Sequence, residues 1–222
     1  MPTRFLPGIR RSVPLLCLVL AGCAGIPDSV RTLPDPGVVL ELDDTPFFAQ
    51  DDYQCGPAAL ATVLEASGVS VELTDLVDKV YVPGRRGSLQ LELLAASRTS
   101  GRLPYIVDGT LSALTDEIRA GRPVIVLQNL GVAALPRWHY AVVVGIDGPG
   151  DRVILRSGVE QRRLTPINLF LRTWARGGYW ALTVLRPGEI PGNVNRERYF
   201  SAVVGLEQAD RHDDAIAAWR AA

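Results

Sequence analysis

The chain has 222 residues, with 23 basic and 24 acidic side chains, 47% hydrophobic residues and 21% charged residues. This length suits one ordinary domain of about 150 residues with extensions. The hydrophobic and charged fractions exclude a wholly disordered chain. The near-zero net charge argues against a nucleic-acid-binding protein, which would carry a basic excess. With only three cysteines and two histidines, no histidine-rich metal site can form, and we expect neither a metal nor another cofactor.

The N-terminus has the anatomy of a secretory signal. Arginines precede an apolar core of eight residues (13–20) and the small pair Ala21-Gly22. An apolar run of this length is too short to cross a bilayer, which requires about 20 residues. Leu20-Ala21-Gly22-Cys23 resembles the bacterial lipobox, which implies that residues 1–22 are removed together with Cys17. An ordinary cleaved signal is the alternative.

The resemblance to the lipobox implies that Cys23 becomes a lipidated N-terminus that anchors the protein to a membrane of the bacterial cell envelope. The residue after Cys23 is Ala24 and not aspartate, and in the lipobox pattern this favours sorting to the outer membrane. The domain would then face the periplasm. Residues 24–46 contain four prolines and little periodicity. We therefore predict that residues 23–44 form a tether that lifts the following domain off the membrane.

Cys55 would be the only free thiol after export, in a compartment that oxidises thiols. A lone cysteine of this kind is either buried and inert or retained for its reactivity. Gly56-Pro57 follows directly, then the helical sequence 58–66, and proline suits the first helical position. The pattern places Cys55 at a helix N-terminus, where the helix dipole favours the thiolate. We predict that Cys55 is a nucleophile.

The next segments alternate between helical and extended patterns, with most helices preceding the strands. We expect helices at 71–80, 89–98 and 111–120, a short extended segment at 103–107 and a buried strand at 123–129. Helices followed by strands favour an α+β layout over alternating βαβ units.

The base for Cys55 must come from one of the two histidines. His212 lies in a polar turn between two helical segments, and we expect it to be solvated. His139 lies at the start of 138–146, a buried strand by its length and β-branched content. A packed core histidine is the alternative, but a cysteine and a histidine far apart in sequence are the expected nucleophile–base arrangement.

These residues carry a resemblance to a known family. The segment 47–60, Phe-Phe-Ala-Gln-Asp-Asp-Tyr-Gln-Cys-Gly-Pro-Ala-Ala-Leu, together with His-Tyr-Ala-Val-Val-Val-Gly at 139–145, resembles the C39-like, papain-related cysteine peptidases. More narrowly, the chain is similar to a bacterial lipoprotein subgroup in which this domain is coupled to tetratricopeptide repeats. The resemblance covers about residues 45–187.

The resemblance implies a papain-like α+β fold, with N-terminal helices packed on an antiparallel sheet, that acts on a peptide or protein substrate. It implies Cys55 as nucleophile and His139 as general base. Gln50 matches the glutamine of the oxyanion hole in this family, and Gln54 is the less favoured alternative.

The third catalytic position departs from the family pattern. The family places an Asp or Asn on the strand after the histidine, and Ser157 stands there in this chain. If 139–146 and 152–159 form a hairpin, residue 146 faces 152 and 141 faces 157. Ser157 then lies diagonal to His139 on one face, about 7 Å away between backbones. Asn129, at the end of the preceding strand, is another candidate.

A serine brings no charge to stabilise an imidazolium. A second hypothesis therefore stands beside the peptidase: a catalytically weak or inactive peptidase-like domain that binds peptides or scaffolds a partner. Amide hydrolysis or transpeptidation on cell-wall peptides with the same Cys–His pair is a third. Among Trp138, Trp174 and Trp180, Trp138 is the best candidate to line a substrate groove, whereas Arg162-Arg163 is expected to be solvated surface.

The C-terminal part begins after a helix predicted at 165–176 and a closing strand at 180–185. A linker starts at 186, and residues 188–222 contain two helical segments, 195–208 and 213–222. Small and aromatic residues fall where a tetratricopeptide repeat has its packing positions: Ala202, Ala215, Trp219 and Ala222. A single repeat cannot bury its own apolar face. The hairpin must therefore dock on the peptidase domain, pair with a partner protein or belong to a longer array, and a plain helical hairpin is the alternative.

Overall fold

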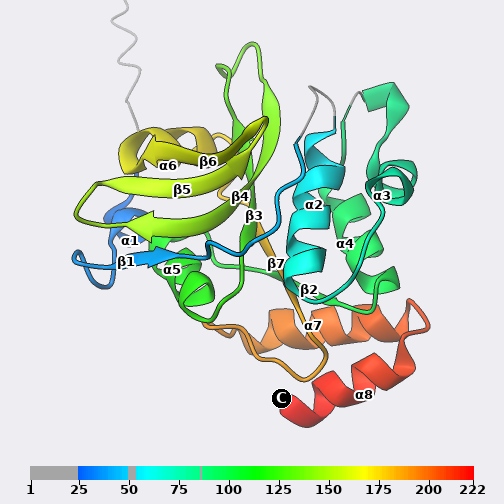
Figure 1. Ribbon diagram of the computed structural model, residues 1–222. Helices are drawn as coiled ribbons and strands as arrows, with labels where there is room; N and C mark the ends of the chain where they lie inside the picture. Colours follow the sequence, from blue (N-terminus) through cyan, green and yellow to red (C-terminus); the bar gives the residue numbers. More distant parts are fainter. Residues whose placement is uncertain (1–24, 50–53, 86) are drawn as a thin grey trace, which may run out of the picture.

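The computed structural model describes residues 25–49, 54–85 and 87–222. Cys17, Cys23 and Gln50 lie outside these residues, and so does most of the predicted signal and lipidation segment. In the described ranges no helix is long and apolar enough to span a membrane. The elements, in chain order (Figure 1), are α1 (Asp28–Arg31), β1 (Val39–Glu41), α2 (Cys55–Ala66), α3 (Leu73–Val80), the 3-10 helix η1 (Pro83–Arg85), α4 (Gln90–Thr99), β2 (Leu103–Ile106), α5 (Leu111–Arg119), β3 (Val124–Asn129), β4 (Trp138–Asp147), β5 (Arg152–Ser157), β6 (Glu160–Pro166), α6 (Ile167–Ala175), β7 (Ala181–Leu185), α7 (Arg196–Glu207) and α8 (His212–Ala221).

One antiparallel sheet forms the centre of the domain. Its strands follow the order β2-β7-β3-β4-β5-β6, and β1 pairs with the far end of β4. All six residues of β3 are buried, which agrees with the continuous apolar pattern of Val124–Leu127. Helices packed on an antiparallel sheet confirm the predicted α+β fold class.

The two faces of the sheet are covered by different helices (Figure 1). Side chains alternate across a strand. In β4, Tyr140, Val142 and Val144 pack with α2, α3 and α4 in one apolar cluster. Ala141 and Val143 belong to a second cluster with α5, α6 and α7. The start of α2 thus faces the beginning of β4, and this arrangement positions the candidate site.

A bulge in β4 corrects the predicted register of the β4–β5 hairpin. Near the turn, Ile146 pairs with Val153, not with residue 152, so the predicted pairing is wrong there by one position. The register shifts between Val143 and Gly145, and beyond the shift Val142 pairs with Arg156. This last pair agrees with the predicted pairing of 141 with 157, because the extra residue of the bulge absorbs the offset.

The segment predicted as a tether packs on the domain over most of its described length. Val30 of α1 and Val38 are buried in the core, and β1 pairs with β4 from Val39↔Asp147 onward. The prediction of a free tether is therefore wrong for residues 28–41. This proline-containing stretch adds a strand to the sheet.

Strand β6 was not predicted. Its first five residues, 160–164, are exposed, and this stretch lacks the apolar alternation that marks a half-buried strand. The predicted helix at 165–176 accordingly begins later, because Pro166 is the last residue of β6 and the helix starts at Ile167.

The C-terminal helices dock on the domain, the first of the three arrangements considered. The Tyr105 hydroxyl donates to the Asn193 carbonyl at 3.1 Å and accepts from the Asn195 amide at 2.8 Å. Tyr199 and Val203 of α7 join the cluster that includes α5 and α6. The hairpin α7–α8 is thus part of the domain core, and its tetratricopeptide character stays a prediction.

Candidate active site

Cys55 is the first residue of α2, as the sequence predicts. Its side chain is buried, with 9% exposed. Cys55 and Tyr140 belong to one apolar cluster, and the backbone groups of Tyr140, Gly56 and Cys55 lower the pKa of the thiol against the raising effect of burial. Because Tyr140 follows His139 directly in β4, these contacts bring the candidate nucleophile to the strand that carries the candidate base.

Gly56 permits a close approach between the start of α2 and the segment before α4. A Cβ atom on this glycine would lie 2.3 Å from Ser88 Oγ and 2.5 Å from Ser88 Cβ, which is closer than atoms can pack. The Tyr140 hydroxyl donates to the Ser88 carbonyl at 3.3 Å. The Cys-Gly sequence therefore reflects a steric requirement immediately next to the thiol.

His139 is held by the residue predicted as its partner. His139 Nε2 and Ser157 Oγ are joined by a hydrogen bond of 2.8 Å. Ser157 is itself buried at the end of β5, with 5% exposed. The predicted proximity of Ser157 to His139 is confirmed. Since Nε2 contacts Ser157, Nδ1 is the ring nitrogen that this hydrogen bond leaves free.

Asn129, the other candidate for the third position, makes its side-chain hydrogen bonds to the loop between β3 and β4. Its Oδ1 accepts hydrogen bonds from the Gly131 and Arg137 amides, each at 2.9 Å. Its carbonyl accepts two from the Arg176 guanidinium. Asn129 thus closes the loop between β3 and β4, and its carboxamide oxygen is not available to His139.

The structure describes only Gln54 of the two glutamines that could form the oxyanion hole. Gln54 is the N-cap residue of α2 and makes no side-chain cap hydrogen bond. Gln50, the favoured oxyanion-hole residue, is outside the described residues.

Burial sets the protonation of the pair. Desolvation raises the pKa of the Cys55 thiol above its ordinary value of 9.0, against the lowering effect of the backbone hydrogen bonds from Tyr140, Gly56 and Cys55. Desolvation, with Arg163 and Arg137 nearby, lowers the pKa of His139 to about 4. Both groups are therefore neutral at pH 7. Burial thus favours the neutral thiol in the resting state, whereas the helix position alone favours the thiolate.

Sequence reasoning missed the cationic surroundings of His139. Arg163 is exposed, as the sequence predicts, but both Arg163 and Arg137 lower the pKa of the imidazole. The signal was indirect: Arg137 lies two residues before the histidine, and Arg163 belongs to the strand β6 that the sequence did not predict.

Trp138, Trp174 and Trp180 differ in their exposure to solvent. Trp138 is 57% exposed, and the preceding loop also exposes Val132 and Leu135. Trp174 is fully buried, and Trp180 packs edge-on against Tyr140 with ring centroids 5.8 Å apart. Trp138 is therefore the one of the three that a ligand beside His139 can reach.

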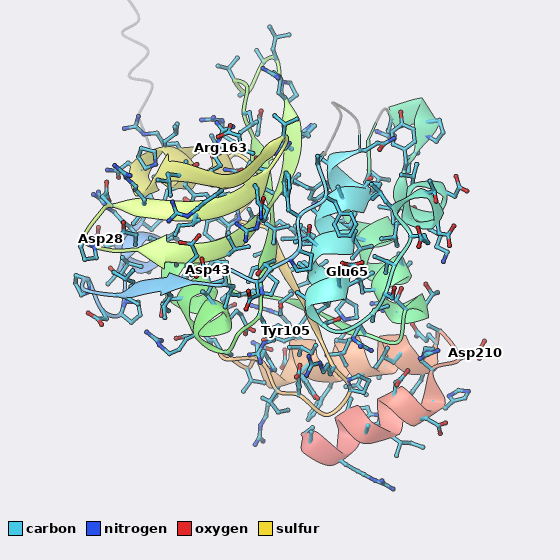
Figure 2. All side chains as sticks on the ribbon, viewed as in Figure 1. Asp28, Asp43, Glu65, Tyr105, Arg163 and Asp210 are labelled. Atoms are coloured by element: carbon cyan, nitrogen blue, oxygen red, sulfur yellow. The ribbon has the colours of Figure 1, made fainter. Side chains whose placement is uncertain are left out.

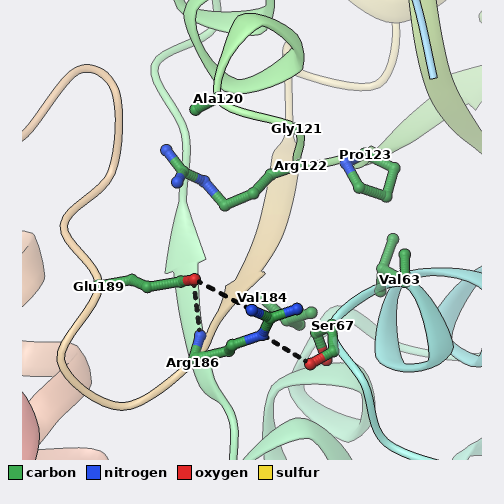
Figure 3. Close-up of a pocket in the computed structure, with 10 residues that line it drawn as sticks. Val63, Ser67, Ala120, Gly121, Arg122, Pro123, Val184, Arg186 and Glu189 are labelled. Carbon is green, nitrogen blue, oxygen red and sulfur yellow. Dashed lines mark hydrogen bonds and ion pairs between the residues drawn. The ribbon is translucent and has the colours of Figure 1, made fainter.

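A separate pocket lies at the other end of α2 (Figure 3). Its lining includes Val63, Ser67 and Arg122, and the Arg186 guanidinium donates to the Ser67 carbonyl at 3.0 Å. A helix rises about 1.5 Å per residue, so Ser67 lies roughly 18 Å from Cys55 along the helix axis. This pocket does not contain the Cys55–His139 pair. Within residues 25–49, 54–85 and 87–222, no group of three or more His, Cys, Asp or Glu side chains has the arrangement of a metal site.

The sequence profile described as the Peptidase_C39 like family matches residues 42–181. The match spans more than half of the chain and includes Cys55, His139 and Ser157. The chain belongs to the C39-like peptidase family. A search of curated proteins finds no match.

Solved structures agree with this C39-like peptidase fold. The chain is similar to a C39-like peptidase from Bacillus anthracis, with 16% identity and a TM-score of 0.56 over 67% of this chain and 98% of the other. It is also similar to the peptidase domain of Streptococcus ComA, a bifunctional ABC transporter of a quorum-sensing pathway, with 16% identity and a TM-score of 0.50 over 64% and 98%. A double-glycine-motif protease from an AMS/PCAT transporter, solved with its leader peptide, is 22% identical with a TM-score of 0.47 over 67% and 91%. At 16% identity the first two likenesses show the fold alone.

Proposed function

We propose that this C39-like family member is a cysteine peptidase that hydrolyses peptide bonds with Cys55 as nucleophile and His139 as general base. The observation that supports this most directly is the position of the thiol against the backbone of Tyr140, next to His139. The hydrogen bond between His139 Nε2 and Ser157 Oγ orients the imidazole ring. A nucleophile beside a base that is itself oriented by a third group is the arrangement of covalent hydrolases.

The neutral pair implies that proton transfer accompanies attack. His139 Nδ1 takes the thiol proton while Sγ bonds to the carbonyl carbon of the substrate. The Cys55 amide, with the Gln50 side chain, donates to the developing oxyanion. The imidazolium then protonates the leaving amine as the C–N bond breaks. Water, activated by His139, hydrolyses the thioester. During these steps Nε2–H donates to Ser157 Oγ, which keeps the ring in one tautomer.

We place this chemistry on the periplasmic side of a bacterial membrane, with the chain held by a lipid on Cys23. The support is the lipobox resemblance of Leu20–Cys23. Peptides or proteins of the cell envelope are then the substrates within reach. Trp138, exposed next to His139, is the side chain that we expect to contact them.

Thiol labelling tests the proposal. An epoxysuccinyl reagent or iodoacetamide is reacted with the full chain, and modification of Cys55 is followed by peptide mass spectrometry. We expect Cys55 to react at least about tenfold faster in the wild type than in His139→Ala, because activated cysteines depend on their base. His212→Ala, which removes an exposed histidine, serves as control and should react like the wild type. Labelling no faster than a model thiol and independent of His139 would remove the peptidase proposal.

A domain that binds peptides without cutting them is the second candidate function. The neutral Ser157 and the lowered pKa of His139, about 4, favour it, because both oppose formation of the imidazolium. Peptide binding that Cys55→Ala leaves intact, with no cleavage by the wild type, would support this second function.

A further inference from the structure

We propose that the active site prefers substrates with a carboxylate close to the scissile bond, held by the guanidinium groups of Arg137 and Arg163. The inference rests on the proposed function and names the substrate class. In this account the substrate supplies the negative charge that the neutral Ser157 does not.

The strand register brings Arg163 close to the hydrogen-bond partner of His139. Arg163 of β6 pairs with Leu155 of β5, and Ser157 follows Leu155 by two residues. The register shifts between Leu155 and Ser157, and Ser157 pairs with Glu160, so Arg163 lies close to Ser157 on the neighbouring strand. Figure 2 labels Arg163 on this outer part of the sheet.

Arg137 is close to His139 along the chain. It precedes His139 by two residues, and its amide and carbonyl continue the β3–β4 pairing through Asn129 Oδ1 and the Leu130 amide. Its side chain is exposed. Both guanidinium groups lower the pKa of His139, which agrees with their positions beside the ring.

The described carboxylates do not balance these charges. Arg163 has one ion pair, with Glu160 at 3.1 Å, and both side chains are about half exposed, so the pair is weak. Among the described residues Arg137 has no ion-pair partner, and Arg176, at the same end of the sheet, binds the Asn129 carbonyl. Asp51 and Asp52 are outside the described residues. The hydrogen-bond partner of His139 is a hydroxyl, not a carboxylate.

Electrostatics then favours an anionic substrate at the acylation step. Acylation turns neutral His139 into an imidazolium, and two neighbouring positive charges oppose this change. A carboxylate between Arg137 and Arg163 offsets their charge and makes His139 a stronger base. The carboxylate itself takes no proton, since the proton still passes from Cys55 through His139 to the leaving amine.

Two alkylating reagents of similar size measure this preference without a known substrate. Iodoacetate is an anion and iodoacetamide is neutral. In each case an S–C bond forms, the C–I bond breaks, iodide leaves and the thiol proton is lost. Relative to free glutathione, we expect the iodoacetate-to-iodoacetamide rate ratio at Cys55 to be about tenfold higher, the size of a local electrostatic concentration effect.

Arginine variants separate this preference from general reactivity. In Arg137→Gln/Arg163→Gln the ratio should fall to the value of glutathione, while the iodoacetamide rate stays the same or rises. Arg152→Gln, at the turn end of β5 where Arg152 pairs with Asp147, is the matched control and should keep the wild-type ratio. A wild-type ratio equal to that of glutathione, or a ratio unchanged in the double variant, would overturn the proposal.

Peptide pairs that differ only by Glu or Gln next to the scissile bond extend the test to turnover. The wild type should cleave the Glu peptide with about tenfold higher kcat/KM, and the double variant should not discriminate. Equal cleavage of both peptides by the wild type contradicts the anion preference and leaves the peptidase intact. If neither peptide is cleaved in a Cys55-dependent way, the proposed function fails, and the labelling ratio alone decides whether the site binds anions.

Discussion

Cys55 and His139 lie where a helix start and a strand start meet, and their protonation follows from how deeply the fold buries them. The positions could be predicted from sequence, because Gly56-Pro57 marks a helix N-terminus and the run after His139 marks a buried strand. The neutral state could not, because desolvation depends on what covers the thiol. Ser88 and Tyr140 supply part of that cover.

Ser157 is the residue at which the charge of the site can be changed most simply. In Ser157→Asp a carboxylate would lie beside Nε2, and a charge at this distance raises the pKa of His139 by about 1 to 3 units. We expect Cys55 to react faster with iodoacetamide between pH 6 and 7, with a pH profile shifted from that of the wild type. Ser157→Ala, which removes the hydrogen bond without adding charge, should react more slowly than the wild type. An identical profile in Ser157→Asp would contradict the assigned contact.

The partly buried neutral imidazole also makes the fold sensitive to acid. The pKa of His139 is about 4 in the folded state and 6.5 without the fold, so the unfolded chain binds more protons between these values. The free energy of unfolding therefore rises with pH from about 4 to 6.5, and as pH falls through this window about 3 kcal/mol is lost. Urea unfolding at pH 4.5 and 7 measures the change. His139→Gln has no titrating group at this position, so its free energy of unfolding should change between these two pH values by about 2 kcal/mol less than that of the wild type. An equal change in both proteins would contradict the neutral state of His139.

At the scale of elements, the predicted strand pairing located Ser157 beside His139 but left out one strand of the sheet. The hairpin of β4 and β5 placed Ser157 correctly, although its turn is one residue out of the predicted register, because a single-residue bulge cannot be seen in an apolar run. The sequence does not predict strand β6, which carries Arg163, because this exposed edge strand has no apolar alternation. The charge of Arg163 near His139 was therefore not predicted either.

Arg156 of β5 connects these strands to the segment before α2. Its buried guanidinium donates to the carbonyls of Asp43, Thr45 and Gln161. In Arg156→Met these carbonyls lose their partners, and we expect the free energy of unfolding to fall by about 3 kcal/mol. Hydrogen exchange of residues 42–48 should become faster by a larger factor than that of β3. Arg152→Met, on the exposed end of the same strand, is the control. Unchanged exchange at 42–48 would show that Arg156 does not hold this segment.

At the scale of the whole molecule, both ends of the described chain belong to the domain. The sequence suggested a tether before it and a separate repeat after it, because short elements with prolines and small residues resemble linkers. Burial of Val30 and Val38 at one end, and of Tyr199 and Val203 at the other, shows one continuous core. A lipid on Cys23 would therefore hold the domain close to its membrane, since few residues separate Cys23 from α1.

Docking of the C-terminal hairpin predicts that it unfolds together with the rest of the C39-like domain. Tyr199 is 1% exposed, and its hydroxyl donates to the carbonyls of Glu189 and Ala218, each at 3.2 Å. Tyr199→Ala should lower the free energy of unfolding by about 3 to 5 kcal/mol, the usual cost of truncating a large buried aromatic side chain. Denaturation followed by circular dichroism and by the fluorescence of the buried Trp174 should give one shared transition. The neighbouring Phe200 is 38% exposed, and Phe200→Ala should cost much less. Two separate transitions would mean that the hairpin folds independently.

The most direct test of the Cys55–His139 peptidase is a digest of a peptide library by the full chain under reducing conditions, followed by mass spectrometry of the products. The wild type should generate new peptide termini, and Cys55→Ala should generate none. His139→Ala should reduce cleavage by at least about a hundredfold, the usual contribution of a general base. If the wild type yields no products beyond those of Cys55→Ala, the chain is not a peptidase that works through Cys55.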